Sequence, residues 1–189
     1  MEDTELIART GRGDRDALGL LYDRHARAVY SFAWMLTQSI PDSEDVTQEV
    51  FLALARKPRA FDPARSQART WLLAVARNHV LRRRRRDARK IAADSEEVGF
   101  ASRTEDSERM LLDLERADAV QHALAALPSA QREALYLVDF EGLSLAETAA
   151  VLEIEGNAVK SRLFRARERM KRLLRPLKPA LSWKGENTE

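Results

Sequence analysis

Residues 142–174 read GLSLAETAAVLEIEGNAVKSRLFRARERMKRLL, and this stretch decides the fold of the second half of the chain. Gly142 suits the left-handed turn that commonly ends a helix. Ser144, with Glu147 three residues later, has the pattern of a capping box, which begins a helix. After a tight turn, a second and basic helix is expected from about Asn157. Two short helices at this spacing indicate a helix-turn-helix unit.

The second of these helices has an apolar stripe and a basic face. The stripe that we expect to pack on the rest of the unit consists of Val159, Leu163, Met170 and Leu173. Arginine and lysine can donate to guanine, phenylalanine can touch the thymine methyl group, and residues near the helix start reach base edges. An amphipathic hairpin with a merely solvated basic face would show the same pattern. The residues that we predict to contact DNA are Asn157, Lys160, Ser161, Arg162, Phe164, Arg165 and Arg169.

Charge is distributed unevenly along the chain of 189 residues, whose formal net charge is +2. Residues 82–90 contain seven basic side chains and one acid, and residues 157–179 contain nine basic side chains and one acid. Between these blocks, residues 94–118 contain nine acids and three arginines. Two basic blocks on predicted helices, separated by an acidic segment, indicate two nucleic-acid contacts joined by a segment that avoids DNA.

The remaining sequence also shows helical periodicity and no alternating strand pattern. Pro41 and Asp42 begin the third expected helix, with Asp42 as its cap. Val46, Val50 and Leu54 form its apolar stripe. The helices that we expect before the helix-turn-helix unit cover about residues 4–9, 14–36, 41–56, 69–89, 111–126 and 129–140.

These patterns predict an all-α fold with two small helical domains joined by a flexible acidic linker. The second domain would contain the helix-turn-helix unit. We expect the first domain over residues 1–90, the linker over 91–110 and the second domain over 111–175. No role is predicted for the tail, residues 176–189.

Composition argues against several other classes of protein. The chain has no cysteine, which excludes disulfides, thiolate metal sites and a thiol nucleophile. His25, His79 and His122 lie far apart, and no glycine-rich phosphate loop or nucleophile motif is present. We therefore expect neither enzymatic activity nor a metal or other cofactor. The acidic N-terminus does not resemble a signal peptide and the apolar runs are short, so we expect a cytoplasmic protein without membrane insertion.

Segments in both halves match the motifs of one protein family. In the second half they are VKSRLFRAR at 159–167, preceded by LP at 127–128 and EGLS at 141–144. In the first half they are DSEDVTQEVF at 42–51, FDP at 61–63, TWL at 70–72 and ARN at 76–78. In order and spacing these segments resemble the extracytoplasmic-function (ECF) group of the bacterial sigma-70 family, over roughly residues 5–175.

The resemblance implies a sigma factor, which binds core RNA polymerase and directs promoter-specific transcription initiation by reading the −35 and −10 elements. Asp45, Gln48 and Glu49 would contact the clamp helices of the polymerase β′ subunit, and the second domain would contact the β flap and the −35 DNA. Most of the family are restrained by an anti-sigma factor, so such a partner is expected. The residues that the resemblance assigns to the −10 element are Phe61, Asp62, Arg65, Arg69, Trp71, Asn78, Arg82, Arg83 and Arg84.

The chain departs from the family just before the basic helix of the second domain. The family usually has Leu-Gly-Ile-Pro followed by Gly-Thr, whereas this chain has LEIE at 152–155 and GNA at 156–158. The family's −35 preference therefore cannot be transferred. Two alternatives are weaker. A helix-turn-helix regulator that acts without polymerase would leave the first half unexplained. A helical protein that sequesters another factor would not need two separated basic helices.

Overall fold

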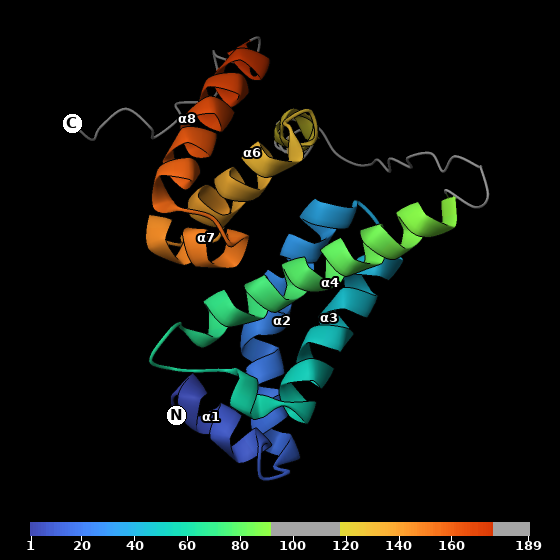
Figure 1. The fold of residues 1–189 in the computed structure, drawn as a ribbon, viewed down its shortest axis with the longest axis vertical. Helices are drawn as coiled ribbons and strands as arrows, with labels where there is room; N and C mark the ends of the chain where they lie inside the picture. The colour runs from blue at the N-terminus through green and yellow to red at the C-terminus, as the bar shows by residue number, and fades with distance from the viewer. Residues whose placement is uncertain (92–117, 176–189) are drawn as a thin grey trace, which may run out of the picture.

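The computed structural model describes residues 1–91 and 118–175, and the regular structure in these two segments is helical (Figure 1). The prediction of an all-α fold is therefore confirmed for the described residues. The first segment contains α1 (Asp3–Thr10), α2 (Arg15–Thr37), α3 (Ile40–Arg56), a short 3₁₀ turn (Pro58–Ala60) and α4 (Ala68–Ile91). The second contains a helical stretch over 118–125, then α6 (Ser129–Leu135), a π-helical turn (Tyr136–Phe140), α7 (Leu145–Leu152) and α8 (Gly156–Leu173).

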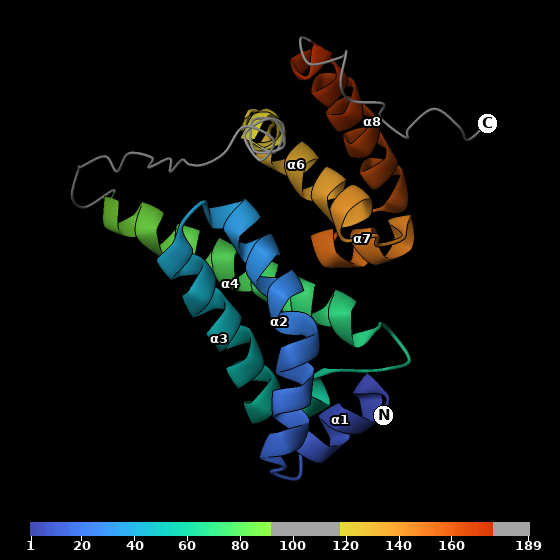
Figure 2. The ribbon, with the colours of Figure 1, turned by 180° about the vertical axis from the view of Figure 1, so that it is seen from behind.

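The first half is a helical body in which α2 and α3 lie side by side and α4 packs on both (Figures 1 and 2). Its core includes Leu21 and Phe32 of α2 together with Val46, Val50 and Leu54 of α3, all of them buried. The predicted apolar stripe of α3 is therefore confirmed. Burial of one such side chain stabilises the fold by about 1.5–3 kcal/mol, so this core holds the four helices together.

The cap of α3 is Ser39 and not the predicted Asp42. The Ser39 hydroxyl accepts a hydrogen bond from the backbone N–H of Asp42 at 3.4 Å. Pro41 follows in the first turn, where its missing N–H breaks no helical hydrogen bond. Serine and aspartate are both good caps, which is why the sequence pattern misplaced the start. Asp42 instead lies in the first turn, where a negative charge favours the helix dipole.

The second half has its own small core under α8. Its buried members include Leu124, Leu127, Leu135, Leu163 and Met170. The predicted helix over 129–140 is present, but its last part widens into the π-helical turn. There the backbone N–H of Glu141 donates to the carbonyl of Tyr136 at 3.0 Å, five residues back. Such widened turns are rare and appear mostly as single turns in an α-helix.

The two halves pack against each other, mainly through α4 and α7 (Figures 1 and 2). Leu143, Val151 and Leu152 of the second half are buried in the same cluster as the core of the first half. The rings of Phe32 and Tyr136 also stack across this contact, with their centroids 5.9 Å apart. The sequence patterns did not predict this association.

Several predictions concern residues outside the described ranges. These are nearly all of the predicted linker (91–110), the expected start of the second domain (111–117) and the tail (176–189). The boundaries set there stay predictions. Within residues 1–91 and 118–175, no helix is both long and apolar enough to cross a membrane.

Candidate nucleic-acid and polymerase interfaces

The helix-turn-helix unit is built by α7 and α8, as the sequence predicted. Gly142 has a φ of +68°, in the left-handed region that glycine adopts without strain. The Ser144 hydroxyl accepts from the backbone N–H of Glu147 at 3.2 Å, and the Glu147 carboxylate accepts from the backbone N–H of Ser144 at 2.9 Å. The capping box is therefore confirmed. The hydrogen bond from the Ser144 hydroxyl, and then that from its N–H, lowers the pKa of Glu147.

The buried stripe of α8 agrees with the prediction except at its end. Val159, Leu163 and Met170 are buried, and Ala166, which the prediction omitted, is fully buried between them. Leu173 was predicted to continue the stripe, but it is 45% exposed. Its neighbour Leu174 packs on the core instead. A period of 3.6 residues carries the stripe from Met170 to a point between these two leucines, so the sequence alone could not choose between them.

The opposite face of α8 is basic and open. Phe164 is 68% exposed in the middle of this face. A large apolar side chain in such a position usually marks a contact surface. The predicted DNA-contacting residues that are exposed are Asn157, Lys160, Ser161, Phe164, Arg165 and Arg169, and Arg162 is half-buried. The structure therefore places the predicted −35 residues together on one helix, with six of the seven on the surface.

Arg167 has a different role from its basic neighbours on α8. Its guanidinium donates two hydrogen bonds to the carboxylate of Asp139, at 2.6 and 3.2 Å. This bidentate pair raises the pKa of Arg167 and ties α8 to the π-helical turn. Arg167 thus serves the packing of the helix-turn-helix unit, which agrees with its absence from the predicted DNA contacts.

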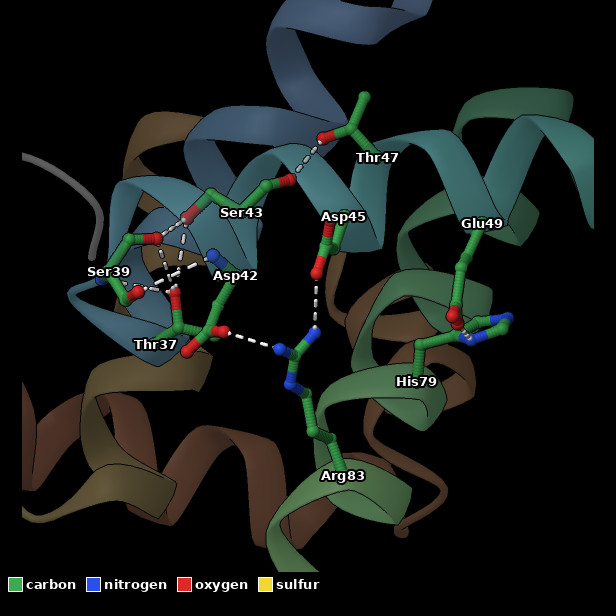
Figure 3. A network of polar contacts seen from close by, with 9 residues as sticks. All are labelled: Thr37, Ser39, Asp42, Ser43, Asp45, Thr47, Glu49, His79 and Arg83. Carbon is green, nitrogen blue, oxygen red and sulfur yellow. Dashed lines mark hydrogen bonds and ion pairs between the residues drawn. The ribbon is translucent and has the colours of Figure 1, made fainter.

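The acidic residues of α3 lie on its outer side, where a polymerase could reach them. Asp45, Gln48 and Glu49 are all exposed, opposite the buried Val46 and Val50. Two of them nevertheless have partners on α4 (Figure 3). Asp45 accepts a hydrogen bond from Arg83 at 3.1 Å, and Glu49 lies 2.6 Å from a ring nitrogen of His79.

Arg83 joins two acidic residues of α3, as Figure 3 shows. Besides Asp45 it pairs with Asp42 at 2.7 Å. The hydrogen bond to Asp45 raises the pKa of Arg83, and this effect outweighs the opposing effect of burial. Arg83 was predicted to contact DNA near the −10 element, whereas here it braces α3 against α4.

The start of α3 is held in place by hydroxyl groups, also drawn in Figure 3. Thr37 Oγ1 lies 3.1 Å from Ser43 Oγ, Ser43 Oγ donates to the carbonyl of Ser39 at 2.6 Å, and Thr47 Oγ1 donates to the carbonyl of Ser43 at 2.7 Å. Ser43 and Thr47 are buried. All three bonds satisfy buried or half-buried polar groups, and the contact between Thr37 and Ser43 ties the end of α2 to the first turns of α3.

The predicted −10 residues of the loop before α4 differ in accessibility. Phe61 is buried, and its ring meets that of the half-buried Trp71 edge to face, with centroids 6.1 Å apart. Asp62 and Arg65 are exposed, and Asp62 accepts from the backbone N–H of Ala64 at 3.0 Å, which stabilises a turn. Phe61 and Trp71 therefore support the loop, while Asp62 and Arg65 are its accessible residues.

The predicted −10 residues of α4 lie along one helix, but several already have partners in the chain. Arg69 pairs with Glu141, and Asn78 donates to Glu153 at 3.4 Å. Arg84 donates to the carbonyl of Leu36. Arg82 is exposed. Residue patterns placed these side chains on α4 correctly, yet they did not show that acids of the second half contact Arg69 and Asn78.

Two further contacts to α4 were missed. Arg77 donates to Glu133 at 2.7 Å, and Thr70 donates to Glu147 at 3.2 Å. A sequence signal for them existed, because Glu133, Glu141, Glu147 and Glu153 are acids spaced through the second half. Their spacing does not say which residue of α4 each one contacts, because that depends on the packing of the two halves.

The three histidines are not brought together. His25 pairs with Asp3 of α1 at 2.7 Å, His79 with Glu49, and His122 with the backbone carbonyl of Asp118 at 2.8 Å. Among the described residues, no group of three or more histidine, aspartate or glutamate side chains could hold a metal ion.

Comparison with known proteins gives the same description of both halves. Residues 21–90 match the family model of sigma-70 region 2, and residues 117–170 match that of sigma-70 region 4. The ECF RNA polymerase sigma factor SigM of Mycobacterium tuberculosis is 38% identical over 175 residues, which cover 91% of this chain and 84% of SigM.

Solved structures resemble the fold as a whole. The sigma factor RpoE in complex with the anti-sigma factor NepR, from Bartonella quintana, matches with a TM-score of 0.67 and 25% identity, over 83% of this chain and 96% of that one. CnrH in complex with the cytosolic domain of CnrY matches with a TM-score of 0.67 and 29% identity, over 92% and 97%.

Proposed function

Since this chain belongs to the extracytoplasmic-function group of the sigma-70 family, we propose that α8 reads the −35 element and α4 the −10 element of its promoters. As a sigma factor it acts with core RNA polymerase in promoter-specific transcription initiation. The observation that carries the assignment is the open basic face of α8, with Phe164 exposed at its centre. Residues 1–90 would form the region-two domain, 91–110 the linker and 111–175 the region-four domain.

For the −35 element, the position of each residue along α8 suggests its partner. Lys160, Ser161, Phe164 and Arg165 lie in the first turns and would face base edges in the major groove. Arg169 lies further along the helix and would meet phosphates, which position the protein without reading sequence. Asn157 lies at the start of the helix, where the chain departs from the family, and would contribute to a −35 preference of its own.

For the −10 element, the loop after Phe61 and the polar side of α4 would hold an unstacked base. Asn78 can donate and accept hydrogen bonds, so it is the better candidate for a base contact than the half-buried Trp71. Unstacking a base costs a few kcal/mol, which hydrogen bonds and stacking in a pocket can offset. Arg82 and Arg84 would contact phosphates, and Arg83 could do so only after leaving Asp42 and Asp45.

For polymerase binding, the exposed acids of α3 would pair with basic residues of the β′ clamp helices, and the second domain would contact the β flap. Asp45, Gln48 and Glu49 lie on a helix whose start is tied to the end of α2 by the contact between Thr37 and Ser43. A rigid helix of this kind loses little conformational entropy on binding. Catalysis would belong to the polymerase, so we expect no enzymatic activity and no cofactor for this chain in the cytoplasm.

We also infer an anti-sigma factor as a partner, because the similar sigma factor RpoE was solved in complex with the anti-sigma factor NepR. Its docking surface would be a groove between α2 and the second half, lined mainly by apolar side chains. In a variant with Trp71→Phe and Trp183→Phe, binding of the partner should change the fluorescence of Trp34. A complex that forms without any change would contradict this location. The apolar lining includes Tyr30, Trp34, Met35, Leu124, Tyr136 and Phe140.

Run-off transcription tests the function directly. Neither this protein nor core polymerase alone should start at the target promoter, and the mixture should give a defined start site. Charge reversal at Asp45 and Glu49 (Asp45→Lys with Glu49→Lys) should abolish capture of core polymerase. The cost in folding stability should stay below about 1 kcal/mol, because both ion pairs lost are at the surface.

A matched control is reversal of two exposed acids of α1 and α2, Glu5→Lys with Asp16→Lys. It makes the same change in net charge away from the proposed interface and should retain polymerase binding. Capture of the Asp45 and Glu49 variant at the wild-type level would sink the interface assignment. Transcription by core polymerase that never depends on this protein would sink the assignment of function.

A further inference from the structure

The end of α1 closely approaches the 3₁₀ turn that precedes the proposed −10 loop (Figures 1 and 2). Gly11 follows α1 directly, and a Cβ atom added there would lie 2.9 Å from Pro58 Cγ and 3.4 Å from Pro58 Cβ. Carbon atoms in favourable contact are about 3.5–4.0 Å apart. The Pro58 ring is closed onto the backbone, so its Cγ cannot swing aside as the end of a flexible side chain would.

The requirement for glycine at this position is one of space. Gly11 has a φ of −65°, which any residue can adopt, so its backbone conformation does not call for glycine. The close approach to Pro58 does, because any larger residue brings a Cβ atom into the Pro58 ring. A side chain at position 11 would therefore move either α1 or Pro58.

Of these two, α1 is firmly attached to the rest of the first half. Leu6 is fully buried and Ile7 is 4% exposed. The Asp3 carboxylate also pairs with two residues of α2, with Arg24 at 2.8 Å and with His25 at 2.7 Å. Because apolar burial and ion pairs both hold α1 on α2, we expect Pro58 to give way.

A movement of Pro58 would pass directly into the proposed −10 loop. The carbonyl of Pro58 accepts a hydrogen bond from the backbone N–H of Phe61 at 3.2 Å. Phe61 is buried, and its ring meets that of Trp71. The carbonyl of Asp62 then accepts from the backbone N–H of Arg65 at 3.1 Å. The places of Asp62 and Arg65 thus depend on the segment that begins at Pro58.

The loop has room to shift on the side of α1. An open cavity of about 390 Å³ lies there, and its lining includes Ile7, Gly11, Pro58, Phe61 and Pro63. Packing leaves this part of the space between α1 and the loop empty. The close contact of Gly11 with Pro58 is therefore a point at which α1 can set the position of the loop.

Gly11 also lies outside the segments to which the family match assigns a role, since the match to sigma-70 region 2 begins at residue 21. We propose that Gly11 is a positioning residue for the −10 element. Because it has no side chain, α1 supports Pro58 at the distance that places Asp62 and Arg65 correctly for the −10 strand. This proposal rests on the proposed role of that loop at the −10 element.

Gly11→Ala tests the proposal in the holoenzyme. Its affinity for a single-stranded −10 non-template oligonucleotide should fall about fivefold, as for other residues that act on a site through their neighbours. Its discrimination against oligonucleotides with one −10 base replaced should change as well. An unchanged affinity would overturn the positioning role. An equal loss of affinity for all −10 sequences would also overturn it, because it would show a general structural role.

Gly19→Ala is the matched control. Gly19 is an exposed residue of α2, where an added Cβ would lie within 4 Å of nothing in the described chain beyond its own helix. The chemical change is the same, so this variant should keep the wild-type affinity and discrimination. The same loss in both variants would refute a specific role of Gly11.

A second substitution at Pro58 tests the contact itself. Pro58→Ala removes Cγ, the atom nearest to the methyl group that Gly11→Ala adds. The double variant, Gly11→Ala with Pro58→Ala, should therefore bind the oligonucleotide more tightly than Gly11→Ala alone, since residues in contact do not have additive effects. If circular dichroism shows that Gly11→Ala is unfolded, the double variant should regain the fold. A double variant no better than Gly11→Ala in folding or binding would overturn the proposal.

The wild type separates this proposal from the function on which it rests. A wild-type holoenzyme that starts at the promoter but shows no preference among −10 oligonucleotides would refute the proposed role of the loop. A normal preference in both the wild type and Gly11→Ala would refute the positioning role alone. All variants should capture core polymerase at the wild-type level, because the exposed acids of α3 are unchanged.

Discussion

The two basic helices, α4 and α8, carry similar side chains but have different neighbours. On α8, Lys160, Arg165 and Arg169 are exposed, and the described residues offer them no hydrogen-bond or ion-pair partner. On α4, Arg69 and Arg77 pair with acids of the second half. The positions of the two helices explain the difference. The basic side chains of α8 are exposed, whereas α4 lies between α2 and α3 on one side and α7 on the other (Figures 1 and 2).

This difference shows how far a charge pattern can be interpreted. A run of arginines indicates that a helix suits negatively charged partners. It does not indicate whether the partner in the folded chain is a nucleic acid or a row of carboxylates. The basic face of α8 is open to solvent, whereas Arg69 and Arg77 of α4 already pair with acids of the second half. Five substitutions, on α4, α7 and α8, test this contrast.

The largest effect is expected for Arg77→Ala. Removal of this side chain leaves the Glu133 carboxylate buried without a partner, which for a buried pair costs about 3 kcal/mol. This loss of stability cannot exceed the free energy that holds the two halves together, because Glu133 becomes solvated when the halves separate. Urea unfolding followed by circular dichroism measures the loss in the free energy of unfolding.

Arg169→Ala is the matched substitution on α8. Arg169 is exposed, so its removal should change the free energy of unfolding by no more than about 0.5 kcal/mol. An equal loss in the free energy of unfolding for Arg77→Ala and Arg169→Ala would contradict the difference between α4 and α8. The two helices would then be equally free of partners within the chain.

The next effect concerns reading by α8. Arg165→Ala should cost about 1–3 kcal/mol at the preferred −35 sequence and flatten discrimination at one or two positions. Arg172 lies further along the helix, so Arg172→Ala should weaken all sequences alike and lower the salt slope by about 0.9 if it meets a phosphate. Binding of the holoenzyme to a library of −35 variants at several salt concentrations measures the sequence preference and the salt dependence of each variant. A changed preference in Arg172→Ala, with none in Arg165→Ala, would show that α8 is placed wrongly in the groove.

The smallest effect concerns α7, which lies between the two basic helices. Ser144→Ala removes the capping box and should cost about 1 kcal/mol of stability. Because the pKa of Glu147 is lowered in the folded chain, its contribution is present above the ordinary glutamate pKa and is lost as pH falls through the lowered value. Thermal unfolding at neutral and acid pH measures this, and the difference in stability between the wild type and Ser144→Ala should shrink in acid. A difference in stability that stays constant with pH would argue against a charged Glu147 in the cap.

Much of the fold followed from patterns within a few turns of helix. Gly142, Ser144 and Glu147 predicted the start of α7, and the spacing of Val159, Leu163 and Met170 predicted the buried side of α8. Such signals work because a cap or a helical face depends on residues three or four positions apart. The prediction failed where two nearby residues suited the same role. Ser39, and not Asp42, caps α3, and Leu174, and not Leu173, continues the buried stripe of α8.

Local patterns were thus enough to predict the helices, the helix-turn-helix unit and most of the surface residues of α8 and α3. Only the tertiary structure decided that Arg69 meets Glu141, that Arg77 meets Glu133 and that Arg83 joins α4 to α3. These partners are 38 to 72 residues apart in the chain. Local periodicity contains no information about which helices will adjoin. The pairing of charges follows from the burial of Leu143, Val151 and Leu152 between the halves, and that burial exists only once the whole chain has packed.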